Sequence, residues 1–201
     1  RNSPDGKVHI IGHSKGGVDA RYAISRLDLG PMVASLTTMA TPHHGSPIAR
    51  MILDRTRSGI LGPVIGTVLD IIGDDRRVLE SLTPEYMDGV FNPSVPDHPD
   101  VKYYSIAFHM GEGGVSSSYV PWLWLSNALT EYADGSKNDG LVSVPSATWG
   151  ELIEVIESDH ISQLRNEMAA MKKAAKTKKQ PEPRKPARSS GEKTKSAAPP
   201  P

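Results

Sequence analysis

The sequence contains no cysteine, which excludes disulfides and metal sites built on thiolates. It also gives no redox indication of the cellular compartment. Aromatic residues make up only 5% of the chain. No apolar run reaches the roughly 20 residues that a membrane-spanning helix needs, and the nearest one, Gly59 to Gly73, is short and broken by glycine and proline. The chain begins with Arg1 rather than methionine, so we expect it to start inside a longer gene product, with any signal peptide on the preceding part.

The formal charge balances over the whole chain but is unevenly distributed. Residues 172–201 hold ten basic and two acidic side chains, a net charge of +8, which leaves −8 on residues 1–171. Lys, Pro, Ala and Ser dominate the last 30 residues, a composition that cannot bury a core. We therefore predict a globular part over residues 1–171 and a disordered basic tail over residues 172–201. The tail has no aromatic residue for stacking on bases, so no nucleic-acid partner is expected.

The N-terminal part of the sequence predicts a βαβ unit. Val8 to Ile11 has the pattern of a short buried strand. Gly17 to Leu27 carries an apolar stripe at helical spacing, and Val33 to Met39 is a second strand rich in β-branched residues. A strand, a helix and a strand within about 35 residues indicate a parallel sheet and an α/β fold.

Further elements follow along the chain. Helices are predicted over Pro47 to Arg55 and over Ile161 to Lys173. A further helix is predicted to begin at Pro84, with Thr83 as its N-cap. The proline-containing segment Asn92 to Asp100 is predicted as loop. Strands are predicted over three further ranges: Val101 to Ala107, Val142 to Val144 and Leu152 to Ile156.

The segment Lys7 to Gly17, KVHIIGHSKGG, contains the pattern G-x-S-x-G as Gly12, Ser14 and Gly16. In a nucleophile elbow, this spacing lets the backbone turn tightly between a strand and a helix, so that the serine hydroxyl points outward. Both flanking elements are predicted here, which favours a nucleophile over an ordinary turn serine. A phosphate-binding loop is excluded, because its lysine precedes the hydroxyl residue whereas Lys15 follows Ser14.

A serine nucleophile needs a histidine base and an orienting acid, which follow it in the order acid, then histidine. His160 is the best base, because it lies between the last predicted strand and the last predicted helix. Asp139 is the best acid, 21 residues before it, although an Asp in a tight turn commonly caps its own backbone. Asp134 is the alternative acid. The other histidines are weaker candidates for the base: His9, His13, His43, His44, His98 and His109.

Several blocks of the sequence, in order, resemble triacylglycerol-lipase-like members of the α/β-hydrolase superfamily. They read IGHSKGGVDARYAISRL, VASLTTMATPHHGSPIA, FNPSVPDHPDVKYYS, NDGLVSVPSATWGE and SDHISQ, and they extend over about residues 6 to 168. The similarity is to the fungal and bacterial branch. It implies a partial α/β-hydrolase fold, with a mainly parallel sheet from the elbow strand onward and a helical lid segment.

The resemblance implies an acyl-ester hydrolase with Ser14 as nucleophile, Asp139 as acid and His160 as base. The backbone N–H of Lys15 would be one oxyanion donor. Related bacterial lipases hold calcium with an Asp two residues after the histidine, where this chain has Ser162. We therefore expect no metal and no cofactor.

The resemblance also identifies residues 46–75 as the candidate lid. The apolar spacing of this segment fits a core-facing helix equally well, so both interpretations stay open. The strands and the His-Gly loop that normally precede the elbow are not in the sequence. We therefore expect a partial domain, an elbow strand left as an exposed apolar edge, and little activity from the 201 residues alone.

The leading hypothesis is hydrolysis of lipid acyl esters of the triacylglycerol type through an acyl-enzyme. The alternatives are a glycolipid deacylase or thioesterase of the same fold, and a non-catalytic lipase-like interaction fragment. The expected partner is a lipid or ester substrate, and transient contact with a membrane or lipid-droplet surface is a further hypothesis. In the non-catalytic alternative, the basic tail would contact an anionic membrane or nucleic acid, although it lacks aromatic residues for stacking on bases. The sequence indicates neither oligomeric state nor location.

Overall fold

The computed structural model describes residues 6–55, 75–111 and 123–163. The chain divides into two units, Arg1–Asn166 and Glu167–Pro201, and all described residues belong to the first. The predicted tail over residues 172–201, nearly all of the predicted helix from Ile161 and the larger part of the candidate lid lie outside the described residues. The division between the globular part and the tail therefore stays a prediction.

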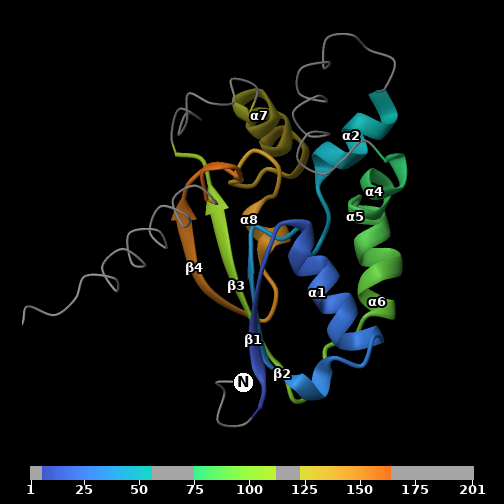
Figure 1. The fold of residues 1–201 in the computed structure, drawn as a ribbon. Coiled ribbons are helices and arrows are strands. Elements are labelled where there is room, and N and C mark those ends of the chain that lie inside the picture. Colours follow the sequence, from blue (N-terminus) through green and yellow to red (C-terminus); the bar gives the residue numbers. More distant parts are fainter. Residues whose placement is uncertain (1–5, 56–74, 112–122, 164–201) are drawn as a thin grey trace, which may run out of the picture. The chain divides into compact units, whose positions relative to one another are not determined.

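Four parallel strands form the sheet, in the order β1 (Val8–His13), β2 (Val33–Met39), β3 (Lys102–His109) and β4 (Glu151–Glu157). The spatial order follows the sequence order, so each connection crosses to the neighbouring strand. Right-handed crossovers of this kind place the connecting helices on one face of the sheet. Figure 1 shows α1 (Lys15–Arg26) and the segment from α4 to α6 on the same side of the strands.

The connection from β2 to β3 carries most of the helices. It contains α2 (Pro47–Arg55), α4 (Arg76–Ser81) and a continuous helical stretch made of α5 (Pro84–Tyr86), the π-helical turn η3 (Met87–Phe91) and α6 (Asn92–Ser94). Thr83 caps α5, because its side chain accepts a hydrogen bond from the backbone N–H of Tyr86. The short 3₁₀ turn η1 (Gly30–Met32) precedes β2, while α7 (Leu123–Asp134) and α8 (Val144–Ala147) lie between β3 and β4.

The largest hydrophobic cluster lies where α2, α4 and α7 meet the carboxyl end of the sheet. Its buried members include Ile48, Ile52, Leu79, Leu123 and Leu141. Burial of each such side chain contributes about 1.5–3 kcal/mol. Helix α2 therefore has a side that faces the core. For this part of residues 46–75, the structure agrees with a core-facing helix, one of the two interpretations left open by the sequence.

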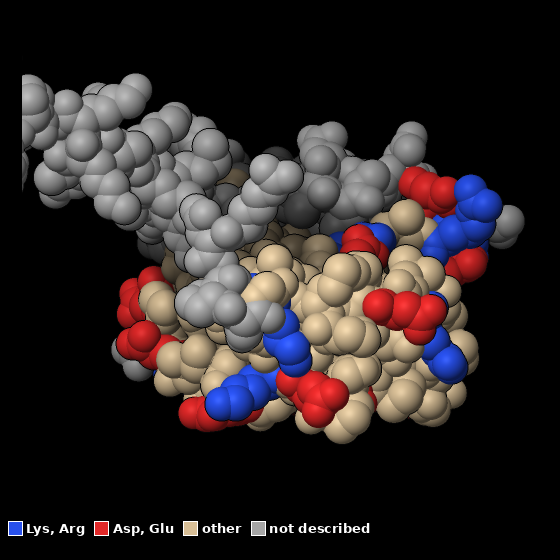
Figure 2. Space-filling view, turned by 60° about the horizontal axis from the view of Figure 1, so that its bottom comes forward, with Lys and Arg blue, Asp and Glu red and all other residues tan. Residues whose placement is uncertain are grey.

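Ion pairs contribute little to this stability. Three helices carry exposed pairs four residues apart: Lys15–Asp19 on α1, Arg50–Asp54 on α2 and Arg76–Glu80 on α4. Figure 2 likewise shows acidic and basic side chains beside one another around a broad area of uncharged residues. Exposed pairs of this kind contribute about 0.3–0.5 kcal/mol each. Across the described ranges, no helix is long and apolar enough to cross a membrane.

Most predicted elements are confirmed, and β2 and α2 have the predicted bounds. The strand over Val142 to Val144 is wrong, because Ser143 caps helix α8 and Pro145 stands near its first position. The loop over Asn92 to Asp100 is partly wrong, since its first three residues form α6. The apolar pattern of the elbow strand predicts a buried strand, which is wrong, whereas the expectation of an exposed apolar edge agrees with the structure: β1 is an edge of the described sheet, and Ile11 is 68% exposed.

Candidate active site

Ser14 is the single residue between β1 and α1, and its backbone is in a conformation that serine rarely adopts, with φ 51° and ψ −134°. Such a conformation costs on the order of 1–3 kcal/mol and persists where the surroundings enforce it. Here the N–H of Ser14 donates to the carbonyl of Met39 at 2.9 Å, and its own carbonyl accepts from Gly17 at 3.0 Å. Unlike most N-cap serines, Ser14 makes no capping hydrogen bond through its side chain with the described residues. Its hydroxyl is therefore available to the site.

The elbow depends on close approach of the backbone at two glycines. A Cβ at Gly12 would lie 2.7 Å from the Cα of Gly17. A Cβ at Gly17 would lie 2.2 Å from the Thr41 hydroxyl oxygen. Gly16 has open space among the described residues. The steric requirement therefore falls on Gly12 and Gly17, and the second glycine of the G-x-S-x-G pattern is not part of it.

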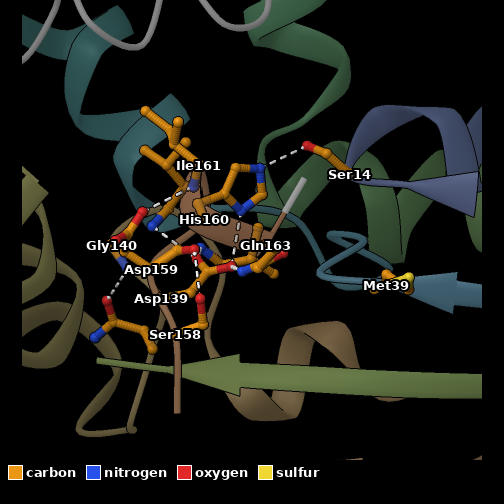
Figure 3. Close-up of polar contacts among 12 residues, drawn as sticks. Ser14, Met39, Asp139, Gly140, Ser158, Asp159, His160, Ile161 and Gln163 are labelled. Carbon is orange, nitrogen blue, oxygen red and sulfur yellow. Dashed lines mark hydrogen bonds and ion pairs between the residues drawn. The ribbon is translucent and has the colours of Figure 1, made fainter. Parts of the chain in front are cut away.

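His160 follows β4 and turns toward the elbow. Its Nε2 lies 2.9 Å from Ser14 Oγ, and its Nδ1 lies 2.7 Å from Asp139 Oδ2 (Figure 3). The ring is only 1% exposed. Asp159 holds this loop, because its Oδ1 accepts hydrogen bonds from the N–H groups of Ile161 and Ser162. Both imidazole nitrogens are thus engaged, one by an acid and one by a hydroxyl.

Asp139 lies in the turn between α7 and α8, fully buried. Its Oδ1 accepts from the N–H groups of Leu141 at 3.0 Å and Val142 at 2.8 Å. Gly140 permits this turn with a φ of 98°. The carbonyl of Asp139 also accepts from the N–H of His160 at 2.9 Å. Several fixed donors therefore compensate the buried carboxylate and hold it against the imidazole.

The alternative site residues lie elsewhere. Asp134 caps a surface turn by accepting from Ser136 N–H. Four of the other histidines bond away from Ser14: His9 to Ser35, His44 to Asp88, His98 to Asp100 N–H, and His109 to the Met110 carbonyl. Of the histidines considered as bases, the structure brings only His160 to the serine.

His43 is buried and belongs to a separate polar cluster with Arg21. The Arg21 guanidinium lies 3.5 Å from the centre of the Trp149 ring and donates to His43 Nδ1 at 3.2 Å. His43 Nε2 then donates to Thr38 Oγ1 at 2.9 Å, and Thr38 donates to the Tyr104 carbonyl. Burial, reinforced by the charge of Arg21, holds the pKa of His43 well below its ordinary value. Burial also lowers the pKa of Arg21 to about 10. This cluster anchors the loop that follows β2.

The sequence did not predict the roles of two residues, Gln163 and Gly17. Gln163 donates through Nε2 to Asp139 Oδ2 at 3.0 Å, and its Oε1 lies 3.0 Å from His13 Nε2. Gly17 is the close-contact glycine described above. The block SDHISQ ends on Gln163 but indicates no role for it, whereas the pair Gly16-Gly17 could have indicated a second tight contact.

An apolar pocket opens beside Ser14 and His160. It has about 320 Å³ of empty space, part of it open to solvent. Besides these two residues it is lined by Pro42, Ser46, Ala49, Leu82, Leu141 and Val142. The hydroxyl of Ser46 donates to the carbonyl of Leu141, so the polar group on this wall is already paired. The pocket therefore suits an apolar group of a ligand bound beside Ser14.

No group of histidine and carboxylate side chains in the described ranges is arranged to hold a metal ion. Ser162, at the position of the family's calcium ligand, donates instead to Asp159 Oδ2 at 2.7 Å. Lys15 begins α1, and its ammonium pairs with Asp19, so its side chain is engaged away from the serine. Its N–H is at the first helical position, where no intrahelical acceptor exists.

The sequence of the chain is similar to known lipases. The chain is 31% identical over 160 residues to triacylglycerol lipase 2 of Saccharomyces cerevisiae, covering 77% of this chain and 44% of the yeast protein. It is 38% identical over 71 residues to a triacylglycerol lipase of Pseudarthrobacter phenanthrenivorans, covering 33% of this chain and 21% of that one. No protein-family model matches. The chain thus spans less than half of the length of these curated relatives.

Solved structures share the fold. The mature lipase BlEst2 of Bacillus licheniformis superposes with a TM-score of 0.66 at 22% identity, over 84% of this chain and 64% of that one. The metagenomic carboxyl esterase MGS0156 gives a TM-score of 0.58 at 24% identity, over 80% of this chain and 47% of that one. The parallel sheet, the nucleophile elbow and these likenesses define an α/β-hydrolase. The chain therefore has the fold of this superfamily, and its sequence is similar to triacylglycerol lipases over part of their length.

Proposed function

We propose that this chain carries the catalytic centre of a carboxylic-ester hydrolase that acts on lipid acyl esters of the triacylglycerol type. The observation that carries the proposal is the continuous hydrogen-bonded chain from Ser14 Oγ through His160 to Asp139, next to an apolar pocket. The similarity to lipases and esterases supports ester hydrolysis as the reaction class.

In the first half of the reaction, His160 Nε2 accepts the proton of Ser14 Oγ as the oxygen attacks the ester carbonyl. The carbonyl oxygen becomes an oxyanion, and the N–H of Lys15 donates to it. The tetrahedral intermediate then collapses, and His160 gives its proton to the departing alkoxide. The alcohol leaves, and the acyl group remains bound to Ser14.

In the second half, water takes the place of the alcohol. His160 removes a proton from the water, which attacks the acyl carbonyl and forms a second oxyanion. The Ser14–acyl bond breaks, and His160 returns the proton to Ser14 Oγ. The free carboxylic acid leaves. Asp139 stays ionised throughout, holds Nδ1 in the protonated tautomer and stabilises the imidazolium.

The pocket supports an acyl chain as the bound group. Its wall at Ala49, Leu82 and Val142 is apolar, and burial of each methylene of a ligand there contributes about 0.8 kcal/mol. A charged group would lose its hydration at this wall without gaining a partner. Glycolipid deacylation and thioester cleavage use the same acyl half of the substrate, so these alternatives differ from the proposed reaction only in the leaving group.

The test uses the purified full-length protein and a panel with one acyl chain on four leaving groups. These are a triacylglycerol emulsion, a glycolipid ester, an acyl thioester and a p-nitrophenyl ester. Hydrolysis of the glycerol ester that disappears in Ser14→Ala supports the proposal. Preference for the glycolipid or thioester would replace the substrate class and keep the mechanism. Absence of all four hydrolyses in a folded protein would favour the non-catalytic alternative.

A further inference from the structure

Gln163 connects the elbow and Asp139 by a route that does not pass through His160. It is 3% exposed and lies three residues after His160. Its side chain bonds to Asp139 Oδ2 at one end and to His13 Nε2 at the other, each at 3.0 Å. Figure 3 shows its side chain beside Asp139 and His160.

The direction of both hydrogen bonds is fixed by chemistry. An ionised carboxylate only accepts, so the amide must turn its NH₂ group toward Asp139. The amide oxygen then faces His13, and His13 Nε2 must carry the hydrogen. His13 therefore donates a hydrogen bond to Gln163, and Gln163 donates one to Asp139. A reversed amide would present an oxygen to the carboxylate.

These bonds close a ring around the reacting atoms. Ser14 bonds to His160, His160 to Asp139, Asp139 to Gln163 and Gln163 to His13, which precedes Ser14 in the chain. Among the described residues, Gln163 thus adds a connection between the elbow and the acid that does not pass through the imidazole that must move protons.

We propose that Gln163 is a positioning residue for the reaction, acting through Asp139 and through the elbow residue His13. This inference rests on the proposed ester hydrolysis. Gln163 fixes the carboxylate oxygen that His160 Nδ1 uses, and it presents the positive end of an amide dipole to that oxygen. It thereby sets both the position of the imidazole and its affinity for a proton.

The charged surroundings of His160 are simple in the described part of the chain. Asp139 is in contact, and the His13 ring centre lies 5.0 Å from that of His160. Asp159, the residue before His160, accepts hydrogen bonds from Ile161 and Ser162 through its carboxylate oxygens. Burial, followed by the charge of His160, lowers the pKa of His13. His13 thus serves as a neutral donor to Gln163 and does not compete for the catalytic proton.

The experiment compares Gln163→Met with the wild-type full-length protein, because Met keeps the length and removes both hydrogen bonds. We expect kcat to fall about ten- to a hundredfold, the range for losing a hydrogen bond to a charged group. KM for a short ester should change by less than about threefold, because Gln163 does not line the pocket. The apparent pKa on the acidic limb of kcat/KM should rise, because the carboxylate beside His160 loses a neutralising donor.

His13→Phe breaks the same link at its other end and keeps a ring at this position. We expect a smaller fall in kcat, and a double variant no slower than about the slower single variant, since both act through one connection. This second variant keeps the inference testable if Gln163→Met does not fold. Thr148→Val, which removes a hydrogen bond to the Val144 carbonyl away from the site, is the matched control and should leave the pH profile unchanged.

An active wild-type protein whose Gln163→Met variant keeps kcat within twofold and an unmoved acidic limb would overturn the inference. Multiplicative losses in the double variant would also overturn it, because they would show two independent effects. If the wild type itself neither hydrolyses esters nor reacts at Ser14, the proposed function is wrong, and the inference fails with it. The wild-type measurement thus distinguishes the two failures.

Discussion

His160 Nε2 lies 2.9 Å from Ser14 Oγ, although 146 residues separate the two in the chain. The contact exists because β1 and β4, the two edges of the described sheet, end on the same side in a parallel arrangement. Ser14 leaves the end of β1, and His160 follows the end of β4. The carboxyl ends of parallel strands are where α/β folds place their ligand sites.

The elbow glycines give a prediction with an internal control. We expect Gly12→Ala to lower the free energy of unfolding by about 1–3 kcal/mol, since the added Cβ would meet the backbone of Gly17. Gly16→Ala should be neutral or stabilising by up to about 1 kcal/mol, because Gly16 is exposed and helical. Urea unfolding of both variants checks this. Equal destabilisation would contradict the assignment of close approach to Gly12.

Regular elements were predictable because they follow from local pattern. The β-branched run of β2 and the apolar spacing of α2 fix those elements without tertiary information. The segment Val142 to Val144 reads as a strand by composition, yet the cap at Ser143 and the proline after it decide for a helix. The helix cap at Ser143 thus outweighed the strand propensity of the valines.

The candidate site was predictable only in part. Ser14, Asp139 and His160 stand in motif positions, so the sequence pointed to them, and their catalytic roles stay a proposal. Gln163 was missed because its two partners lie 24 and 150 residues away and no spacing rule joins them. The exposure of Ile11 depends on whether another strand pairs with β1, which local sequence does not encode.

The pocket wall gives a prediction about chain length. Ala49 is 2% exposed and lines the pocket. In Ala49→Val, the added methyl groups take space that an acyl chain would fill. We expect kcat/KM for a decanoyl ester to fall about three- to tenfold relative to an acetyl ester, a difference of roughly 1 kcal/mol. An unchanged ratio in a variant with wild-type melting temperature would show that the pocket wall at Ala49 does not contact the acyl chain.

His43 predicts a pH dependence of stability. Its pKa in the folded protein is well below the ordinary 6.5, so the unfolded chain takes up its proton first as the pH falls. Stability therefore declines as the pH falls below about 6.5, by at most about 1.4 kcal/mol per pH unit for one histidine. His43→Gln keeps both hydrogen-bonding directions without titrating. Urea unfolding between pH 7.5 and pH 5 should show a smaller loss in this variant, and equal slopes would contradict the assignment.

The exposed edge strand predicts self-association of the 201-residue chain expressed alone. Ile11 on β1 is 68% exposed beside an edge that is unpaired among the described strands. We expect Ile11→Lys to raise the monomeric fraction in sedimentation velocity. Tyr132→Lys is the matched control, because Tyr132 is 88% exposed on α7, away from the sheet edge. An equal effect of both substitutions would point to general solubility and contradict a role of the edge.

If Ser14 is a nucleophile activated by His160, it should react with an alkyl phosphonate that labels activated serines. The full-length protein is treated with this reagent and analysed by intact mass and peptide mapping. We expect one adduct on Ser14, no adduct in Ser14→Ala, and labelling slowed by about 10³-fold or more in His160→Ala. A folded wild-type protein that stays unlabelled, or that carries the adduct on another residue, would contradict it.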